Sequence, residues 1–146
     1  RKYRPDFILC NAPDDRHIDH PKGAKLVVDA CFLSGLEKIE STLEGNKQEP
    51  WRPNNIYHYI QWKSLKPDFI VDISNHFKTK IKSVKAFKSQ FYDGNETVHN
   101  TPISTKNFLD SIEYRARDLG RLTNVDYGEG FIAARIPLVE NISELK

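Results

Sequence analysis

The amino-acid sequence predicts an α/β protein with a Rossmann-like layer fold, in which helices flank a largely parallel sheet. Strand-like and helix-like segments alternate along the 146 residues, and this alternation is typical of α/β layer folds. The first strand-like run, residues 7–10, is apolar at every position. This is expected of a strand in a parallel sheet whose two faces are both covered. A chain of this length has the size of one domain, so we expect residues 1–146 to form a single domain.

A loop up to His20 is expected to follow the first strand and to lead into a long, buried helix. Pro21 suits the first turn of that helix, where a missing N–H loses no partner. Residues 23–40 then carry apolar side chains at helical spacing. Residues 44–50 are polar and predict a loop, and the aromatic, β-prone residues 56–62 predict the next strand.

The middle of the chain predicts a third strand and an amphipathic helix. Residues 68–73 form another apolar run, which indicates a buried strand. Ser74 or Asn75 can cap a helix that runs to about Phe91 and places its apolar residues on one face. Residues 93–101 are polar and predict a loop.

The last part of the chain predicts one more helix and one more strand. Ser104 is expected to cap the helix, and Gly120 is expected to end it. Residues 127–136 predict a turn that leads into a late strand.

The composition excludes several classes of protein. Apolar residues make up 38% and charged residues 29% of the chain, which fits a soluble globular protein and not a disordered one. A net charge of +2 is too small to indicate nucleic-acid binding, and the lysines between residues 78 and 88 fit the solvent face of a helix. No apolar run approaches the roughly 20 residues of a membrane span, and the sequence shows no signal-peptide pattern. Cys10 and Cys31 lie in apolar runs and predict buried, reduced thiols, so we expect a cytoplasmic protein. From the charge and the apolar runs, we expect no nucleic-acid and no membrane partner.

Residues 14–20, here called the histidine loop, carry the most informative chemistry of the chain. Seven consecutive residues contain two histidines, three carboxylates and one arginine. The loop follows the first strand, and in open α/β sheets ligands bind beyond the carboxyl ends of the strands. A neutral imidazole binds zinc well, and a neighbouring carboxylate fixes its tautomer. Structural histidines and capping carboxylates would explain the same residues, so both interpretations remain open from the pattern alone.

Several motifs occur in a characteristic order along the chain: Asp15-Arg16-His17-Ile18-Asp19-His20, the Gly-Ala-Lys-Leu-Val start of the first helix, Val71-Asp72-Ile73-Ser74, Lys88-Ser89-Gln90-Phe91 and Tyr127-Gly128-Glu129-Gly130-Phe131. Together they resemble the C-terminal part of the LmbE-like (PIG-L) family of zinc-dependent de-N-acetylases, which act on N-acetylglucosamine conjugates. The order and the residues of these motifs most resemble those of the deacetylases of bacillithiol biosynthesis, which remove acetate from N-acetylglucosaminyl malate. Other LmbE-like substrates, such as inositol-linked glucosamines or chitin-derived sugars, remain alternatives.

The resemblance assigns roles to three residues of the histidine loop. It implies that His20 is a zinc ligand. It implies that His17 stabilises the oxyanion or protonates the leaving amine, and that Asp19 orients His17. A complete enzyme of this family would therefore carry Zn²⁺ as its cofactor and take a small-molecule substrate.

One motif of the family is missing from this chain. The family's His-Pro-Asp-Asp motif supplies two zinc ligands and the general base, whereas no histidine precedes Pro13 in the similar stretch at residues 11–15. Residues 1–4 also resemble the basic end of a helix. We therefore expect the N-terminal strands of the fold to be missing, and residues 1–146 to be inactive alone.

Further residues have both a functional and a structural interpretation. Arg52 and Arg16 are candidate substrate-binding residues, because a guanidinium can bind a carboxylate in a bidentate manner. Each could instead stack on an aromatic ring or pair with a neighbouring carboxylate. The remaining histidines, His58, His76 and His99, are expected to be structural or exposed. The chain could also be a non-catalytic α/β module that binds a sugar or a partner, and it could form a homo-oligomer.

Overall fold

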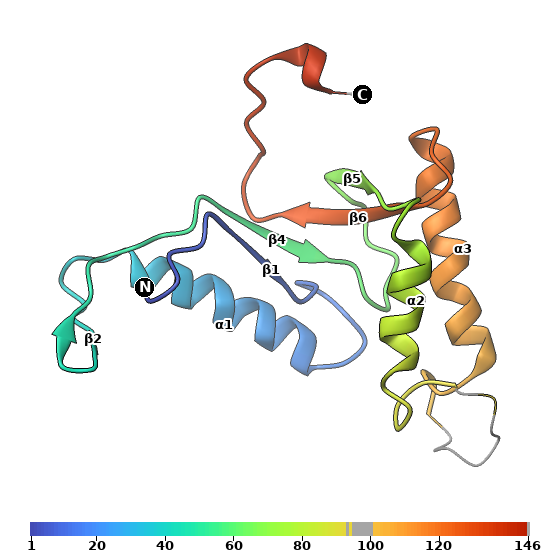
Figure 1. Ribbon diagram of the computed structural model, residues 1–146, viewed down its shortest axis with the longest axis horizontal. Helices are drawn as coiled ribbons and strands as arrows, with labels where there is room; N and C mark the ends of the chain where they lie inside the picture. Colours follow the sequence, from blue (N-terminus) through green and yellow to red (C-terminus); the bar gives the residue numbers. More distant parts are fainter. Residues whose placement is uncertain (93, 95–100, 146) are drawn as a thin grey trace. The chain divides into compact units, whose positions relative to one another are not determined.

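The computed structural model describes residues 1–92, 94 and 101–145 and has a mixed α/β architecture (Figure 1). The helices of the described residues are α1 (Asp19–Ser34), α2 (Phe77–Lys85), α3 (Lys106–Leu122) and the short 3₁₀ helix η1 (Ile142–Glu144). The strands are β1 (Phe7–Cys10), β2 (Thr42–Leu43), β3 (Asn46–Lys47), β4 (Asn55–Tyr59), β5 (Phe69–Asp72) and β6 (Gly128–Ala133). No helix among the described residues is long and apolar enough to cross a membrane.

The main sheet has four strands in the order β1-β4-β6-β5. β1 and β4 are parallel, whereas β4 and β6 are antiparallel. β5 also runs antiparallel to β6, because Asp68 N–H donates to the carbonyl of Phe131 while Ile73 N–H donates to that of Tyr127. The α/β class is confirmed, but the sheet is mostly antiparallel and not largely parallel as predicted. An uninterrupted apolar run carries no information about the direction of the neighbouring strand.

The chain divides into two compact units, Arg1–Phe69 with Gly130–Lys146, and Ile70–Glu129. In the first unit α1 runs alongside β1 (Figure 1), and Ala24 of α1 is buried. In the second unit, Ile73 and Phe77 pack with Ala116 of α3 as a small core. The rings of Phe77 and Tyr127 stack there at a centroid distance of 4.0 Å. The expected single domain stays a prediction.

The first helix, α1, starts and ends earlier than residues 23–40. It begins at Asp19 and ends at Ser34. The backbone N–H of Trp51 and the side chain of Arg1 both donate to the carbonyl of Ser34, at 2.9 and 2.8 Å. Residues 1–4 are not helical, contrary to prediction, and the Arg1 guanidinium instead binds the carbonyl groups of Ser34 and Leu36 at the end of α1.

The second helix is shorter than the predicted residues 74–91. Ser74 does not cap it, because the Ser74 hydroxyl donates to Asp72 and accepts a hydrogen bond from the backbone N–H of Tyr127. The helix therefore begins only at Phe77. Of the polar loop predicted at 93–101, only residues 94 and 101 are described.

The third helix is capped by Thr105, not by Ser104 as predicted. The Thr105 hydroxyl accepts a hydrogen bond from the backbone N–H of Phe108 at 3.1 Å. Gly120 lies within α3 instead of ending it, and the backbone of a later residue passes close to it. A Cβ at Gly120 would lie 2.6 Å from the carbonyl oxygen of Val125.

A short antiparallel hairpin replaces part of the predicted loop at 44–50. β2 and β3 pair through Thr42–Lys47 and Leu43–Asn46. Their two-residue connection, Glu44 and Gly45, has φ values of 51° and 80°. Positive φ at both positions is the requirement of the tightest hairpin turns.

Candidate functional site

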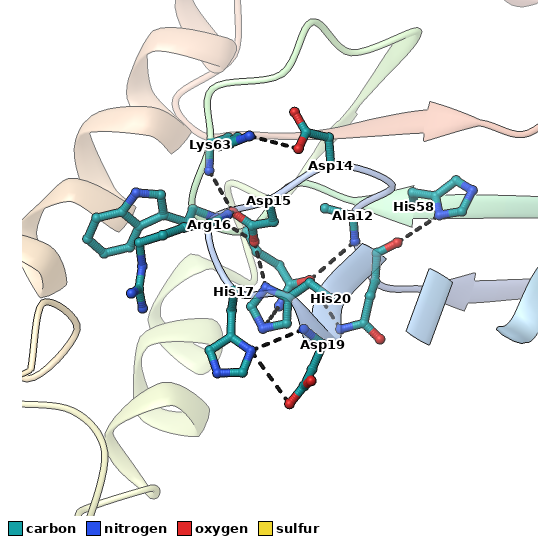
Figure 2. A network of polar contacts seen from close by, with 12 residues as sticks. Ala12, Asp14, Asp15, Arg16, His17, Asp19, His20, His58 and Lys63 are labelled. Atoms are coloured by element: carbon teal, nitrogen blue, oxygen red, sulfur yellow. Dashed lines mark hydrogen bonds and ion pairs between the residues drawn. The ribbon is translucent and has the colours of Figure 1, made fainter. Parts of the chain in front are cut away.

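The histidine loop lies in the first unit, between the carboxyl end of β1 and the start of α1. The segment that follows the parallel strand β4, with Gln61, Trp62 and Lys63, contacts this loop (Figure 2). The candidate site therefore forms where two adjacent parallel strands end. This is the location at which α/β sheets bind ligands, and it is where the sequence predicted the site.

Asp15 is the buried carboxylate at the centre of the site. Its side chain has no exposed surface. It accepts hydrogen bonds from the backbone N–H groups of Arg16 at 2.7 Å, Lys63 at 3.1 Å and Trp62 at 3.3 Å. Burial alone would raise the pKa of Asp15. The hydrogen bond from His20 and those three backbone bonds outweigh burial, and the pKa of Asp15 lies below its usual value.

His20 points toward Asp15 from the first turn of α1. Its Nδ1 atom lies 2.6 Å from Asp15 Oδ2, and 30% of its side chain is exposed. Its Nε2 atom lies 3.2 Å from Nε2 of Gln61. A carboxylate on one ring nitrogen of a histidine is the arrangement that orients metal-ligating histidines.

Gln61 connects His20 to the end of β1. Its Oε1 atom accepts hydrogen bonds from the backbone N–H of Ala12 at 3.2 Å and from the side chain of Asn11 at 3.1 Å. The two loops that follow β1 and β4 are thus joined by hydrogen bonds through both Asp15 and Gln61.

His17 and Asp19 lie beside His20 and are more exposed. The His17 ring centroid is 5.4 Å from that of His20. His17 Nδ1 lies 3.6 Å from Asp19 Oδ2, and half of the His17 side chain is exposed. The backbone N–H of Asp19 also donates to His17 Nδ1 at 3.3 Å. The structure therefore brings together the three loop residues to which the sequence assigned catalytic and metal-binding roles.

The two candidate substrate-binding arginines lie in different places. Arg16 belongs to the histidine loop and stacks on Trp62, with its guanidinium carbon 4.8 Å from the ring centroid. Arg52 donates to the carbonyl of Phe32 at 2.9 Å and stacks on the Phe32 ring. Phe32 is in the last turn of α1, a helix of 16 residues that is about 24 Å long, whereas His20 is in the first. The structure does not bring Arg52 to the histidine loop.

Cys10 and His58 form a buried layer behind the loop. Cys10 Sγ lies 3.2 Å from His58 Nδ1, which donates to the carbonyl of Asn11 at 2.7 Å. Burial, followed by the charge of Cys31, raises the pKa of Cys10 to about 11. Both cysteines are free, as predicted, although Cys31 is only half-buried. His58 has the structural position that the sequence predicted, and His99 lies outside the described residues.

Among the side chains that the structure describes, no group of three or more His, Cys, Asp or Glu residues is arranged to hold a metal ion. His20, oriented by Asp15, fits the chemistry of a single imidazole ligand. A catalytic zinc site needs several protein ligands, so this part of the chain alone does not complete one.

Asp15 and Gln61 are the site residues that sequence reasoning missed. Asp15 belongs to the Asp15-Arg16-His17-Ile18-Asp19-His20 motif, but the family resemblance assigns the orienting role to Asp19 and none to Asp15. Gln61 had no motif. Its position just after a strand was the available signal, since parallel neighbours bring their carboxyl ends to the same edge of a sheet.

The fold is similar to those of several solved structures. A conserved protein from Thermus thermophilus matches with a TM-score of 0.78 and 27% identity, covering 97% of this chain and 57% of that one. The N,N'-diacetylchitobiose deacetylase from Pyrococcus horikoshii matches with a TM-score of 0.65 and 26% identity, covering 91% of this chain and 47% of that one. The 4-carboxy-2-hydroxymuconate hydratase from Pseudomonas putida matches with a TM-score of 0.66 at 17% identity, covering 97% of this chain and 57% of that one, and this likeness concerns the fold alone.

These comparisons place the chain in an α/β fold that enzymes use, including a deacetylase. No family model matches the sequence. The chain spans about half the length of the structures that it matches, 57%, 57% and 47% of them.

Proposed function

We propose that this chain supplies part of the active site of a metal-dependent de-N-acetylase that acts on an N-acetylglucosamine conjugate. The observation that carries the proposal is the Asp15–His20 pair beside the half-exposed His17, at the carboxyl ends of two parallel strands. The similarity of the fold to that of a chitobiose deacetylase supports the same chemistry.

The residues of the histidine loop have separate roles in this proposal. His20 holds the metal through Nε2, while Asp15 fixes its ring. His17 lies close enough to act on the same substrate group, where it donates a proton to the leaving amine or a hydrogen bond to the oxyanion. Asp19 orients His17. A bound zinc ion would polarise the acetamide carbonyl and activate a water molecule.

The remaining metal ligands come from outside the described residues in this proposal. His20 is the one metal ligand that we assign among residues 1–146, and the solved structures of similar fold are about twice as long as the matched region. We therefore expect residues 1–146 alone to bind zinc weakly and to lack deacetylase activity.

The proposed substrate is N-acetylglucosaminyl malate, the conjugate of bacillithiol biosynthesis, in a cytoplasmic enzyme. Arg16 is the arginine of the histidine loop, and its guanidinium can bind a carboxylate of the malate in a bidentate manner. Arg52 lies at the other end of α1 and binds a backbone carbonyl there, so Arg16 is the stronger candidate.

The test uses a longer protein that carries this chain together with a segment containing a His-Pro-Asp-Asp motif. It is incubated with N-acetylglucosaminyl malate and, separately, with N,N'-diacetylchitobiose, and the free amine released is measured with and without a zinc chelator. We expect chelator-sensitive release, faster with the malate conjugate. Sugar binding without release of amine would favour the non-catalytic module and contradict the proposal.

A further inference from the structure

Both ring nitrogens of His20 have hydrogen-bond partners. Nδ1 lies 2.6 Å from the carboxylate of Asp15, and Nε2 lies 3.2 Å from the amide nitrogen of Gln61. The two oxygens of Asp15 also accept hydrogen bonds from the backbone N–H groups of Arg16, Lys63 and Trp62, so this carboxylate serves as the acceptor in the network. Nδ1 of His20 must therefore carry a proton.

The backbone of Ala12 fixes the orientation of the Gln61 amide. A backbone N–H can only donate, so the group 3.2 Å from Ala12 N must be the amide oxygen of Gln61. The amide NH₂ group of Gln61 then faces His20, and it too can only donate. Nε2 of His20 must accept this bond and carry no proton. The hydrogen bonds of Asp15 and Gln61 therefore assign the tautomer of His20 as the one protonated on Nδ1.

We propose that Asp15 and Gln61 are positioning residues that hold His20 as the neutral tautomer protonated on Nδ1, with Gln61 covering the lone pair of Nε2. A ligand that binds Nε2 must first displace the Gln61 amide. Gln61 and Asp15 come from the loops after β4 and β1, so pairing of these two strands sets the geometry of His20. The identification of this ligand as a divalent cation rests on the proposed function.

The tautomer can be measured directly in the metal-free form of the longer protein that carries this chain together with a segment containing the His-Pro-Asp-Asp motif. Two-dimensional ¹H–¹⁵N spectra of the histidine rings distinguish a protonated from an unprotonated ring nitrogen. In the wild-type chain without added metal, at neutral pH, we expect His20 to be protonated on Nδ1 alone. A proton on Nε2 of the wild-type ring would overturn the inference without any variant.

Two variants separate the role of Gln61 from a general effect on the fold. Gln61→Glu keeps the shape of the side chain but turns the donor into an acceptor, so Nε2 of His20 should gain a proton. Lys63→Ala is the matched control from the same segment. Its side chain pairs with Asp14, while its backbone N–H still binds Asp15, so the spectrum of His20 should not change. An unchanged His20 ring in a folded Gln61→Glu chain, verified by circular dichroism, would also contradict the inference.

Zinc chloride alone then serves as the probe of ligand binding. We expect zinc to shift the Nε2 resonance of His20, and Gln61→Ala to strengthen zinc binding about fivefold, since one hydrogen bond no longer has to be broken. Equal or weaker binding by Gln61→Ala would show that Gln61 does not cover Nε2. If the tautomer is as expected but zinc leaves Nε2 unchanged, the positioning roles hold and the assignment of His20 as a metal ligand is wrong.

Discussion

Asp15 illustrates how one buried side chain can determine the geometry of a loop. Its carboxylate binds backbone N–H groups on both sides of the site, from the histidine loop and from the segment after β4. Backbone groups cannot rotate away as side chains can, so the position of the carboxylate is fixed before His20 binds to it. The geometry of the histidine loop therefore depends on Asp15 more than on either histidine.

The stability of the chain should depend on the charge of Asp15. Its pKa is lowered in the folded chain from the ordinary value of 3.8, so its contribution is present above about pH 4 and is lost as the pH falls through the folded-state pKa. Asp15→Asn should lower the free energy of unfolding by roughly 1.5–3 kcal/mol at pH 7, because hydrogen bonds to a charged acceptor are lost. Urea unfolding at pH 7 and pH 3 checks this, and a gap between wild type and variant that does not narrow at pH 3 would contradict it.

Cys10 should be unreactive in the folded chain. Burial and the charge of Cys31 raise its pKa to about 11, and the thiolate is the reactive form. In a Cys31→Ser variant at pH 8, we expect a thiol reagent such as Ellman's reagent to label Cys10 only after urea is added. Rapid, complete labelling of the folded variant would be incompatible with the described burial.

The residues of the site differ in how well sequence could predict them. His17, Asp19 and His20 lie within four positions in one loop, so their proximity needs no knowledge of the fold. Gln61 is 41 positions from His20, and its role depends on which strand pairs with β1. Strand pairing of this kind could not be predicted from the single sequence.

At the scale of the elements, hydrophobic periodicity located each long helix, whereas contacts with residues outside the helix set its ends. By residue type, Ser104 is the better cap of the two, because serine ranks above threonine at this position. Thr105 is the cap because the Ser104 hydroxyl binds the backbone of Thr101 instead. Gly120 looks like a helix stop, but the close approach of the backbone at Val125 requires a glycine there.

Thr105→Ala should therefore destabilise the chain more than Ser104→Ala does. Loss of the bond from Thr105 to the Phe108 N–H should lower the free energy of unfolding by about 1 kcal/mol. Ser104→Ala is the matched control and should have a smaller effect on α3. Urea unfolding followed by circular dichroism measures both, and the reverse order of the two variants would show that the cap is assigned to the wrong residue.

At the scale of the whole chain, the described residues leave apolar side chains exposed on β1 and α1. Phe7 and Leu9 of β1 are 55% and 52% exposed, and Leu26 and Phe32 of α1 are 70% and 56% exposed. β1 is also an edge strand of the described sheet. Edge strands and exposed apolar surface both promote association.

We expect residues 1–146 to associate or to fold only marginally when they are expressed alone. Sedimentation and thermal melting at micromolar concentration test this, with Leu9→Lys and Leu26→Lys together as the variant that should reduce association. A monodisperse monomer with a cooperative melt above about 60 °C, the upper range for mesophilic domains, would contradict the expectation.

The class of the fold could be predicted from the alternation of elements, but the direction of the strands could not. Residues 68–73 predict a strand and residues 127–136 predict a turn that leads into a strand, and the structure has the strands β5 and β6 in these two places. Their antiparallel pairing depends on the path of the chain between them, which contains α2 and α3. The apolar composition of a strand is the same whether its neighbour runs parallel or antiparallel to it.

The most direct test of the central claim compares His20→Ala with His17→Ala in a longer protein that contains this chain and the His-Pro-Asp-Asp motif. Zinc content after dialysis and release of free amine from N-acetylglucosaminyl malate are measured for both variants. We predict that His20→Ala lowers zinc content and activity together, whereas His17→Ala keeps its zinc and loses activity about 100- to 1,000-fold, as for loss of an oxyanion donor. Loss of zinc from His17→Ala with retention in His20→Ala would contradict the assignment of the two histidines, and full activity in both variants would contradict the proposed function.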